Sequence, residues 1–470
     1  MSKVAQLSHT LRQLIEQDVW QAGQKLPSLR EQAQTSGYSL MTVLNAYQEL
    51  EAQGLIYAKE KSGFYVEENI SETKLDHSQT TSLQNHIEIN PLVFQYLKST
   101  QRPNIVPFGS AFPNEALLYC PKLLHIVAQY ARQRKNYSHL DSMPPGLFSL
   151  QQSIARRYSL QGIPSEAQDI VITSGCLDAL NLSLQAIAQN GDYILLQKTM
   201  FYGAWQAAER LGLKVITLPE HPEYGFDLAQ FEHCLKTYPI KVCWLMLNSH
   251  NPIGFTVSDE IKQKIAELLD KYQVHLIEDD VYQELYYGTQ KPRSVKAFDT
   301  QDWVLHCCSF SKVLGAGFRI GWVHNKKLSS KIQYLQMMST LSVSPLLQHA
   351  LVEFLASHHY EKHLKQLRQA LERHKKQFYL YLKQYLPQDC EVYYYPTSYF
   401  LWIKLPKNMN SMQLYQSLLH EHISIAPSQL FTIPETPQNY IRLNCSFEIT
   451  PHIQQALEQL IKHILYQSTK

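Results

Sequence analysis

A lysine in a short serine-rich turn carries the clearest chemistry in this sequence. The turn reads Ser309-Phe310-Ser311-Lys312, and Arg319 follows seven residues after the lysine. A lysine amine can form an imine with an aldehyde, and a serine hydroxyl and an arginine guanidinium can together bind a phosphate dianion. Because Ser-x-Ser-Lys also occurs by chance, the turn indicates a site for a phosphorylated aldehyde only if other segments support it.

Short apolar runs separated by helical patterns predict the strands that would position such a site. The runs cover residues 170–172, 193–196, 214–216, 242–247, 275–277 and 303–306. Near-continuous apolar strands that alternate with helices are typical of a mostly parallel sheet covered by helices on both faces. The last part of the chain, about residues 345–470, mixes long helices with short strands and predicts a smaller α+β lobe.

Polar segments follow four of these predicted strands. They begin at Thr173, Asn251, Glu278 and Ser309, in that order along the chain. Ligands of parallel sheets bind at the carboxyl ends of the strands. Residues 175–177 would form the start of a helix, where their backbone amides could bind a phosphate. Together with the lysine turn, the four segments predict a site for pyridoxal 5'-phosphate.

Each candidate residue also has a structural interpretation. Taken singly, Asp279 is typical of a turn or a helix cap, Lys312 of the solvated surface and Phe201 of the core. Asn251 before a proline indicates a turn, and Arg442 could equally form a structural ion pair. The order and spacing of the four segments favour the cofactor site over these separate interpretations.

From about residue 101 to 470 the chain resembles the fold-type I aminotransferases, which use pyridoxal 5'-phosphate. The resemblance implies that Lys312 binds the cofactor covalently and moves the substrate α-proton, and that Asp279 pairs with the pyridine nitrogen. The other implied contacts are Ser309, Arg319, Gly175, Cys176 and Leu177 for the phosphate, Tyr137 for the phosphate of a partner subunit, Tyr282 and Asn251 for the ring hydroxyl, Phe201 for the ring face, and Arg442 for the substrate carboxylate.

Residues 8–66 form a separate pattern of three helices and a hairpin. Helical patterns end near Gly23 and Gly54, and Ser28 is placed to cap a second helix. Short strands at 55–58 and 64–66 follow the third helix. In that helix the apolar side chains recur at i, i+3, i+4 and i+7, which predicts its buried face; they are Val43, Ala46, Tyr47 and Leu50. This is the outline of a winged helix-turn-helix.

The segment resembles the winged-helix domain of GntR-family regulators. The whole chain from residue 8 resembles their MocR-type subgroup, in which this domain is joined to an aminotransferase-like one. The resemblance implies that the third helix enters the major groove and the wing lies over the minor groove. The implied DNA contacts are Asn45 for an adenine edge, Ser39, Thr42 and Arg30 for phosphates, and Lys59 and Lys61 on the wing. A solvated helix face is the alternative interpretation for Asn45.

Charge and composition limit the partners of the chain. Residues 1–67 carry six Lys/Arg and seven Asp/Glu, and six minus seven gives −1. Phosphate neutralisation supplies most non-specific DNA affinity, so we expect one domain to bind double-stranded DNA weakly and a homodimer on two half-sites to regain affinity. Eight scattered cysteines without a Cys-x-x-Cys pair favour a reducing cytoplasm and no metal site. The chain lacks a long apolar run, so no membrane contact is expected.

The sequence therefore predicts a multidomain protein with a winged helix-turn-helix at residues 1–67, a linker at 68–100 that could carry a short helix near residues 91–98, and a pyridoxal-phosphate-dependent aminotransferase-like domain at 101–470. We expect a transcriptional regulator that senses the cofactor, an amino acid or both. The alternative is an active aminotransferase for an α-amino acid with a subsidiary N-terminal domain, and a third possibility is a DNA-binding scaffold with an inactive pocket. The sequence does not define the operator, the direction of regulation or the amino acid.

Overall fold

The computed structural model divides the chain into two compact units, residues 1–85 and 86–470. It describes residues 3–16, 20, 23–59, 62–67, 91–100, 102, 104–133, 139–220, 225–432 and 439–468. Each unit has its own hydrophobic core, and each is described separately below.

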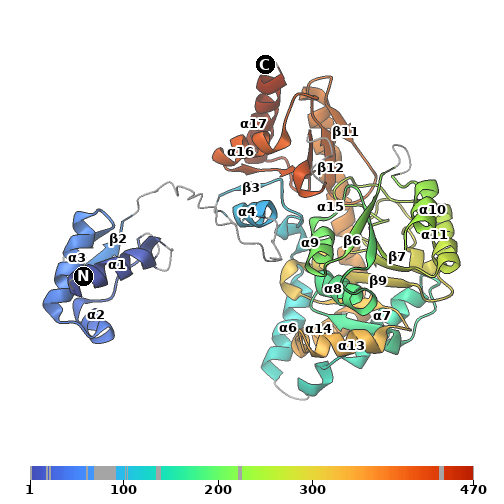
Figure 1. Cartoon of the computed structure of the whole chain (residues 1–470), viewed down its shortest axis with the longest axis horizontal. Helices are drawn as coiled ribbons and strands as arrows, with labels where there is room; N and C mark the ends of the chain where they lie inside the picture. Colours follow the sequence, from blue (N-terminus) through green and yellow to red (C-terminus); the bar gives the residue numbers. More distant parts are fainter. Residues whose placement is uncertain are drawn as a thin grey trace. The chain divides into compact units, whose positions relative to one another are not determined.

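The first unit is a three-helix domain with a β-hairpin (Figure 1). Its elements are α1 (Lys3–Glu16), α2 (Leu29–Ser36), α3 (Leu40–Ala52), β1 (Ile56–Lys59) and β2 (Gly63–Val66). Side chains fix the helix starts: Ser28 and Glu31 form a capping box at α2, and Ser39 accepts a hydrogen bond from the Thr42 amide at α3. The four residues predicted to face inward from α3 are all buried, so the expected winged helix-turn-helix is confirmed.

A seven-stranded sheet lies at the centre of the second unit. Its strands run in the order β4 (Ile170–Thr173), β10 (Gly321–His324), β9 (Val304–Ser309), β8 (His275–Asp279), β7 (Ile240–Leu245), β5 (Tyr193–Gln197) and β6 (Lys214–Leu218). β10 is antiparallel to both of its neighbours, and the remaining pairs are parallel. The largely parallel sheet that the apolar runs predict is therefore confirmed.

Helices cover both faces of this sheet (Figure 1). One face packs against α8 (Cys176–Ile187), α9 (Tyr202–Arg210) and α13 (Ser329–Met337). The other face packs against α6 (Pro121–Gln133), α7 (Phe148–Ser159), α10 (Leu228–Thr237), α11 (Asp259–Tyr272) and α14 (Pro345–Ala356). Because successive strand residues alternate between the two covered faces, the strands are largely apolar.

A smaller lobe is built on the antiparallel sheet β11 (Glu391–Tyr393), β12 (Phe400–Lys404), β15 (Tyr440–Asn444) and β14 (Ala426–Pro427). Its helices are α15 (His359–Tyr385), α16 (Ser411–His420) and α17 (Pro451–Ser468). A two-stranded parallel pair, β3 (Val106–Pro107) and β13 (Ile423–Ser424), ties the start of the unit to this lobe. Two short helices, α5 (Glu115–Leu118) and α12 (Ser311–Leu314), complete the unit.

One helix extends the second unit towards the N-terminus. α4 (Pro91–Ser99) lies in the stretch that the sequence assigns to a linker, but Val93 and Tyr96 are buried in the core of the small lobe. The second unit therefore begins at residue 86, before the sequence-based boundary at 101. None of the described helices is long and apolar enough to cross a membrane.

Candidate functional site

A pocket of about 270 Å³ lies at the carboxyl ends of β4, β8 and β9. It brings together nine of the residues predicted for the cofactor: Cys176, Leu177, Phe201, Asn251, Asp279, Tyr282, Ser309, Lys312 and Arg319. These residues lie at or after the ends of β4, β5, β7, β8 and β9, except Arg319, which precedes β10. The parallel arrangement of the strands places their carboxyl ends at one edge of the sheet, which is where this class of sheet binds ligands.

Lys312 lies on α12, directly after the end of β9, and its side chain is buried. Its Nζ donates a hydrogen bond of 2.7 Å to the carbonyl oxygen of Ala111 and lies 4.0 Å from the centre of the Phe112 ring. Burial, together with the positive charge of Arg442, lowers the pKa of Lys312 to about 7, although Asp279 opposes the change. The amine is therefore substantially neutral near neutral pH, as a nucleophile towards an aldehyde must be.

Asp279 ends β8 and faces the same pocket. Burial raises its pKa to about 6 even though the Val281 backbone amide and the Cys176 thiol, whose Sγ donates to Oδ1 at 3.6 Å, act in the opposite direction. Two titratable groups whose pKa values are shifted towards neutrality in one pocket are typical of a functional site. A carboxylate here is suited to hold a proton on a ring nitrogen.

Three groups converge where a phosphate could bind. Arg319 donates from Nη2 to the carbonyl oxygen of Ser174 at 2.8 Å. Gly175, just before α8, has φ +90°, and a Cβ there would lie 2.7 Å from Arg319 Nη2, so only glycine allows this approach. The first amides of α8 have no carbonyl acceptors one turn earlier in the helix. Among the described residues, the buried Oγ of Ser311 has no hydrogen-bond partner, and Ser311 lines the pocket.

Arg442 lies behind the pocket rather than on its wall. It is 1% exposed on β15, and Nη1 donates to Asn251 Oδ1 at 2.6 Å while Nη2 donates to the carbonyl oxygen of Gly109. Its Nε has no partner among the described residues. The partners in the described part of the chain are amide and carbonyl oxygens and aromatic rings, not carboxylates. The guanidinium therefore carries a buried charge that an anion could neutralise.

Aromatic side chains line the remaining wall of the pocket. Phe201 precedes α9 and lies against Tyr202, with ring centres 4.6 Å apart. Gly203 makes room for this ring, since a Cβ at that position would lie 2.3 Å from Phe201. Tyr282 is buried beyond the end of β8. These flat apolar surfaces are suited to a planar heteroaromatic ring.

Several lining residues have no role in the sequence-based prediction. Ser311 stands in the Ser-x-Ser-Lys turn, and Tyr202 is adjacent to the predicted Phe201. Their positions in the sequence beside predicted site residues are therefore a signal that could have identified both. Phe112 and Leu97 carry no local signal, because they reach the pocket only through packing of segments that precede the sheet. Tyr137, predicted to reach a partner subunit, lies outside the described residues.

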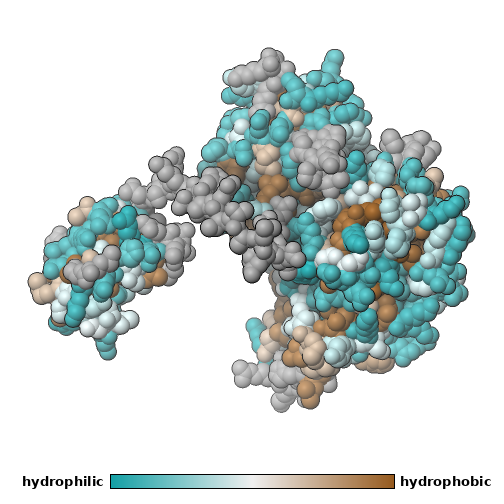
Figure 2. Space-filling view, in the orientation of Figure 1, coloured by the Kyte–Doolittle hydropathy of each residue, from teal (hydrophilic) through white to brown (hydrophobic). Residues whose placement is uncertain are grey.

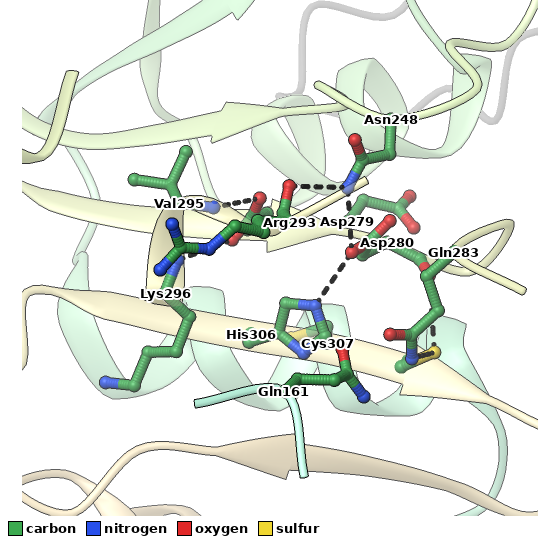
Figure 3. Close-up of polar contacts among 12 residues, drawn as sticks. Gln161, Asn248, Asp279, Asp280, Gln283, Arg293, Val295, Lys296, His306 and Cys307 are labelled. Carbon is green, nitrogen blue, oxygen red and sulfur yellow. Dashed lines mark hydrogen bonds and ion pairs between the residues drawn. The ribbon is translucent and has the colours of Figure 1, made fainter. Parts of the chain in front are cut away.

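A buried polar network supports the strand ends behind the pocket (Figure 3). Asp280 accepts a hydrogen bond from Asn248 at 3.1 Å and pairs with His306 Nε2 at 2.9 Å. The other ring nitrogen, His306 Nδ1, contacts the Tyr158 hydroxyl at 2.6 Å. This network joins β8 to β9. It therefore fixes the position of Asp279 relative to the Ser309–Lys312 turn. Asp280 has no predicted chemical role, and its contacts are structural.

The candidate DNA contacts lie in the first unit. Asn45 is exposed on α3, Arg30 on α2 and Lys59 on β1. Ser39 and Thr42 are at the start of α3, where their hydroxyl oxygens are 2.8 Å apart. Lys61 lies outside the described residues.

Fold and pocket together define a winged helix-turn-helix joined to a fold-type I aminotransferase-like domain. The family model of class I and II aminotransferases matches residues 119–463, and that of the bacterial regulatory proteins of the gntR family matches residues 3–66. The aminotransferase part is similar in fold to a multiple substrate aminotransferase from Thermococcus profundus, with a TM-score of 0.73, 21% identity, and coverage of 80% of this chain and 95% of that one. It is also similar to LysN, the α-aminoadipate aminotransferase of Thermus thermophilus, with a TM-score of 0.72, 22% identity, and coverage of 80% and 95%.

Full-length relatives are regulators. The chain is 44% identical over 464 residues to the HTH-type transcriptional regulator YdcR of Escherichia coli K12, covering 99% of both chains, and 30% identical to YjiR of the same organism, covering 98% of both. It is 26% identical to the HTH-type transcriptional regulator NorG of Staphylococcus aureus USA300, covering 94% of this chain and 99% of NorG. The chain belongs to the MocR-type subgroup of the GntR family, and it is a DNA-binding transcriptional regulator.

Proposed function

We propose that the aminotransferase-like domain binds pyridoxal 5'-phosphate through Lys312 and senses the cofactor or an amino acid on behalf of the DNA-binding domain. The observation that carries this proposal is the buried lysine with a pKa of about 7 beside Asp279. An ordinary surface lysine would be almost fully protonated and unreactive at neutral pH. We further propose that the protein acts in the cytoplasm, where its DNA is found.

The pocket residues fit this cofactor. When bound, pyridoxal 5'-phosphate supplies an aldehyde that captures amines and a ring that withdraws electrons. Arg319, Ser309, the unpartnered hydroxyl of Ser311 and the first amides of α8 would hold its phosphate. Asp279 would keep a proton on the ring nitrogen. These groups provide a dianion site and a carboxylate in one small pocket.

Contacts between the pocket and α4 support the sensing role. The carbonyl oxygen of Gly109 accepts hydrogen bonds from both Arg442 and the Tyr96 hydroxyl of α4. Leu97 of the same helix lines the pocket, and α4 is the first described element after residue 67. An amino-acid carboxylate that attracted the Arg442 guanidinium would compete with Gly109. The change would reach the helix nearest to the DNA-binding domain in the sequence.

We also propose a homodimer. Hydrophobic residues reach the surface over the region of α6 and α14 (Figure 2), and the exposed large hydrophobic residues include Tyr119, Leu124 and Phe148. Exposed apolar residues in such a region are typical of a protein–protein interface. A dimer would also bring two winged-helix domains to one operator. Because each domain has a small net charge and should bind DNA weakly alone, two joined domains are needed for tight binding.

The test combines absorbance with DNA binding. We expect the full-length protein with pyridoxal 5'-phosphate to show a visible absorbance band that Lys312→Ala lacks, and its affinity for a selected DNA duplex to change when cofactor or amino acids are added. Tyr96→Phe should keep the band and lose the DNA response. Tyr415→Phe is the matched control, because its hydroxyl contacts Ser99 of α4 but not Gly109. DNA binding that ignored the cofactor and every amino acid would contradict the proposal.

Transamination is the second candidate function. It is favoured by the same pKa of Lys312, because a lysine that titrates near pH 7 can both accept and return a proton. Multiple turnovers from an amino acid and a keto acid, absent in Lys312→Ala, would establish it. Conversion of at most one equivalent of amino acid would leave sensing as the sole function of the pocket.

A further inference from the structure

The helix that this family of domains inserts into DNA has no basic residue in this protein. α3 contains neither lysine nor arginine between Leu40 and Ala52. Arginine and lysine make the commonest specific contact with guanine, through its O6 and N7 atoms. The side chains of α3 therefore cannot make that contact, and its reading of the major groove must use other chemistry.

The outward side of α3 instead carries an amide and large apolar side chains. Met41, Leu44, Asn45 and Gln48 stand at i, i+3, i+4 and i+7, so they share one face of the helix. Met41 is 64% exposed, and Leu40 beside it is 50% exposed. Both lie in the first turn of the helix, from which recognition helices contact base edges. Half or more of each residue's surface is therefore open to solvent.

Thymine offers the only apolar group on a base edge in the major groove, its C5-methyl. An amide such as that of Asn45 is suited to the N6 and N7 atoms of adenine. We propose that α3 reads A·T base pairs, with Leu40 and Met41 packed against thymine methyl groups and Asn45 on adenine. The inference rests on α3 being the helix that enters the groove. Arg30 and Lys59, which lie on other elements, remain available for phosphates.

The test replaces single thymines by uracil. Duplexes with a randomised segment are first enriched on the full-length protein with its cofactor, and each thymine of the enriched site is then changed to uracil. This change removes only the C5-methyl and keeps every hydrogen-bonding group of the base. We expect at least one thymine in each half-site at which uracil weakens binding roughly four-fold, the effect of exposing one apolar carbon group.

The discrimination should depend on the two apolar residues. In Leu40→Ala combined with Met41→Ala, thymine and uracil duplexes should bind equally. In Gln13→Ala, which changes an exposed residue of α1, the four-fold difference should persist. Because all three side chains are exposed, these substitutions should not unfold the domain, and circular dichroism checks that they do not.

Four results would overturn the inference in distinguishable ways. Equal affinity of the wild-type protein for thymine and uracil duplexes would show that no methyl is read. Discrimination that survived in the double variant would assign the methyl contact to another residue. Failure to enrich any site would contradict DNA binding itself, and with it the inference, whereas enriched half-sites without A·T pairs would contradict the inference alone.

Discussion

Raising the pH from 6 to 8 should increase the rate at which Lys312 captures pyridoxal 5'-phosphate by about tenfold. Capture requires the neutral amine. With a pKa of about 7, the neutral fraction rises from about one tenth to about nine tenths over this interval and then levels off. A lysine with an ordinary pKa near 10.4 would instead gain about a hundredfold over the same interval and continue to gain up to pH 10.

The assay mixes cofactor-free protein with pyridoxal 5'-phosphate in a stopped-flow spectrophotometer and follows the visible absorbance of the bound cofactor. The same reaction with a free lysine derivative reports ionisation of the cofactor itself, so the ratio of the two rates isolates the protein amine. We expect the rate for the protein, divided by the rate for the free lysine, to fall about tenfold between pH 6 and 8. A constant ratio would refute the lowered pKa of Lys312.

The cause of the lowered pKa can be tested separately. Burial contributes most, and the positive charge of Arg442 acts in the same direction. Arg442→Gln removes that charge and keeps a hydrogen-bond donor for Asn251, so the midpoint of the rate profile should move to higher pH. Lys331→Gln, which removes an exposed positive charge from α13, is the matched control and should leave the midpoint unchanged. A midpoint that did not respond to Arg442→Gln would leave burial and the smaller effect of Arg319 as the causes.

Three further results are expected. Gly175→Ala should weaken cofactor binding in a titration, because its Cβ would meet Arg319 at 2.7 Å; Gly162→Ala, at φ +76° with nothing within 4 Å, should not. Although burial opposes ionisation, the adjacent Lys291 and Arg157 lower the pKa of Glu284 to about 2, so Glu284→Gln should cost about 3 kcal/mol of unfolding free energy in urea at pH 7. That stabilisation is present above the ordinary glutamate pKa of about 4.3 and is lost as the pH falls towards 2, so the two proteins should converge in acid. Finally, DNA affinity should depend only modestly on salt. A slope of log K against log[salt] as steep as about −8 would contradict the small number of basic residues in residues 1–67.

The parts of the fold that depend on local pattern were predictable. Apolar runs of strand length identified the parallel strands, because most positions of a sheet buried on both faces are apolar. The i, i+3, i+4, i+7 spacing identified the buried face of α3 for the corresponding reason in a helix. The order of Asn251, Asp279 and Lys312 identified the pocket, since the carboxyl ends of parallel strands share one edge.

Contacts between distant segments could not be predicted in this way. Arg442 was expected to bind a substrate carboxylate, but nothing in the sequence indicated that it also donates to Asn251 and to the Gly109 carbonyl that α4 shares. A short helix near residues 91–98 was likewise expected within the linker, but the sequence did not indicate that its Tyr96 is buried in the small lobe. Neither contact leaves a periodic signal, because each depends on how separately folded elements pack.

The sequence by itself determined the identity and order of the reactive groups and the absence of basic residues from α3, since these are properties of the covalent chain. Only the tertiary structure decided how those groups behave. The low pKa of Lys312 arises from burial and from the positive charge of Arg442, which is distant in the chain, and the exposure of Leu40 and Met41 depends on which face of α3 the core covers. Solvent access and electrostatic interactions act through space, so they become defined only when the chain has packed.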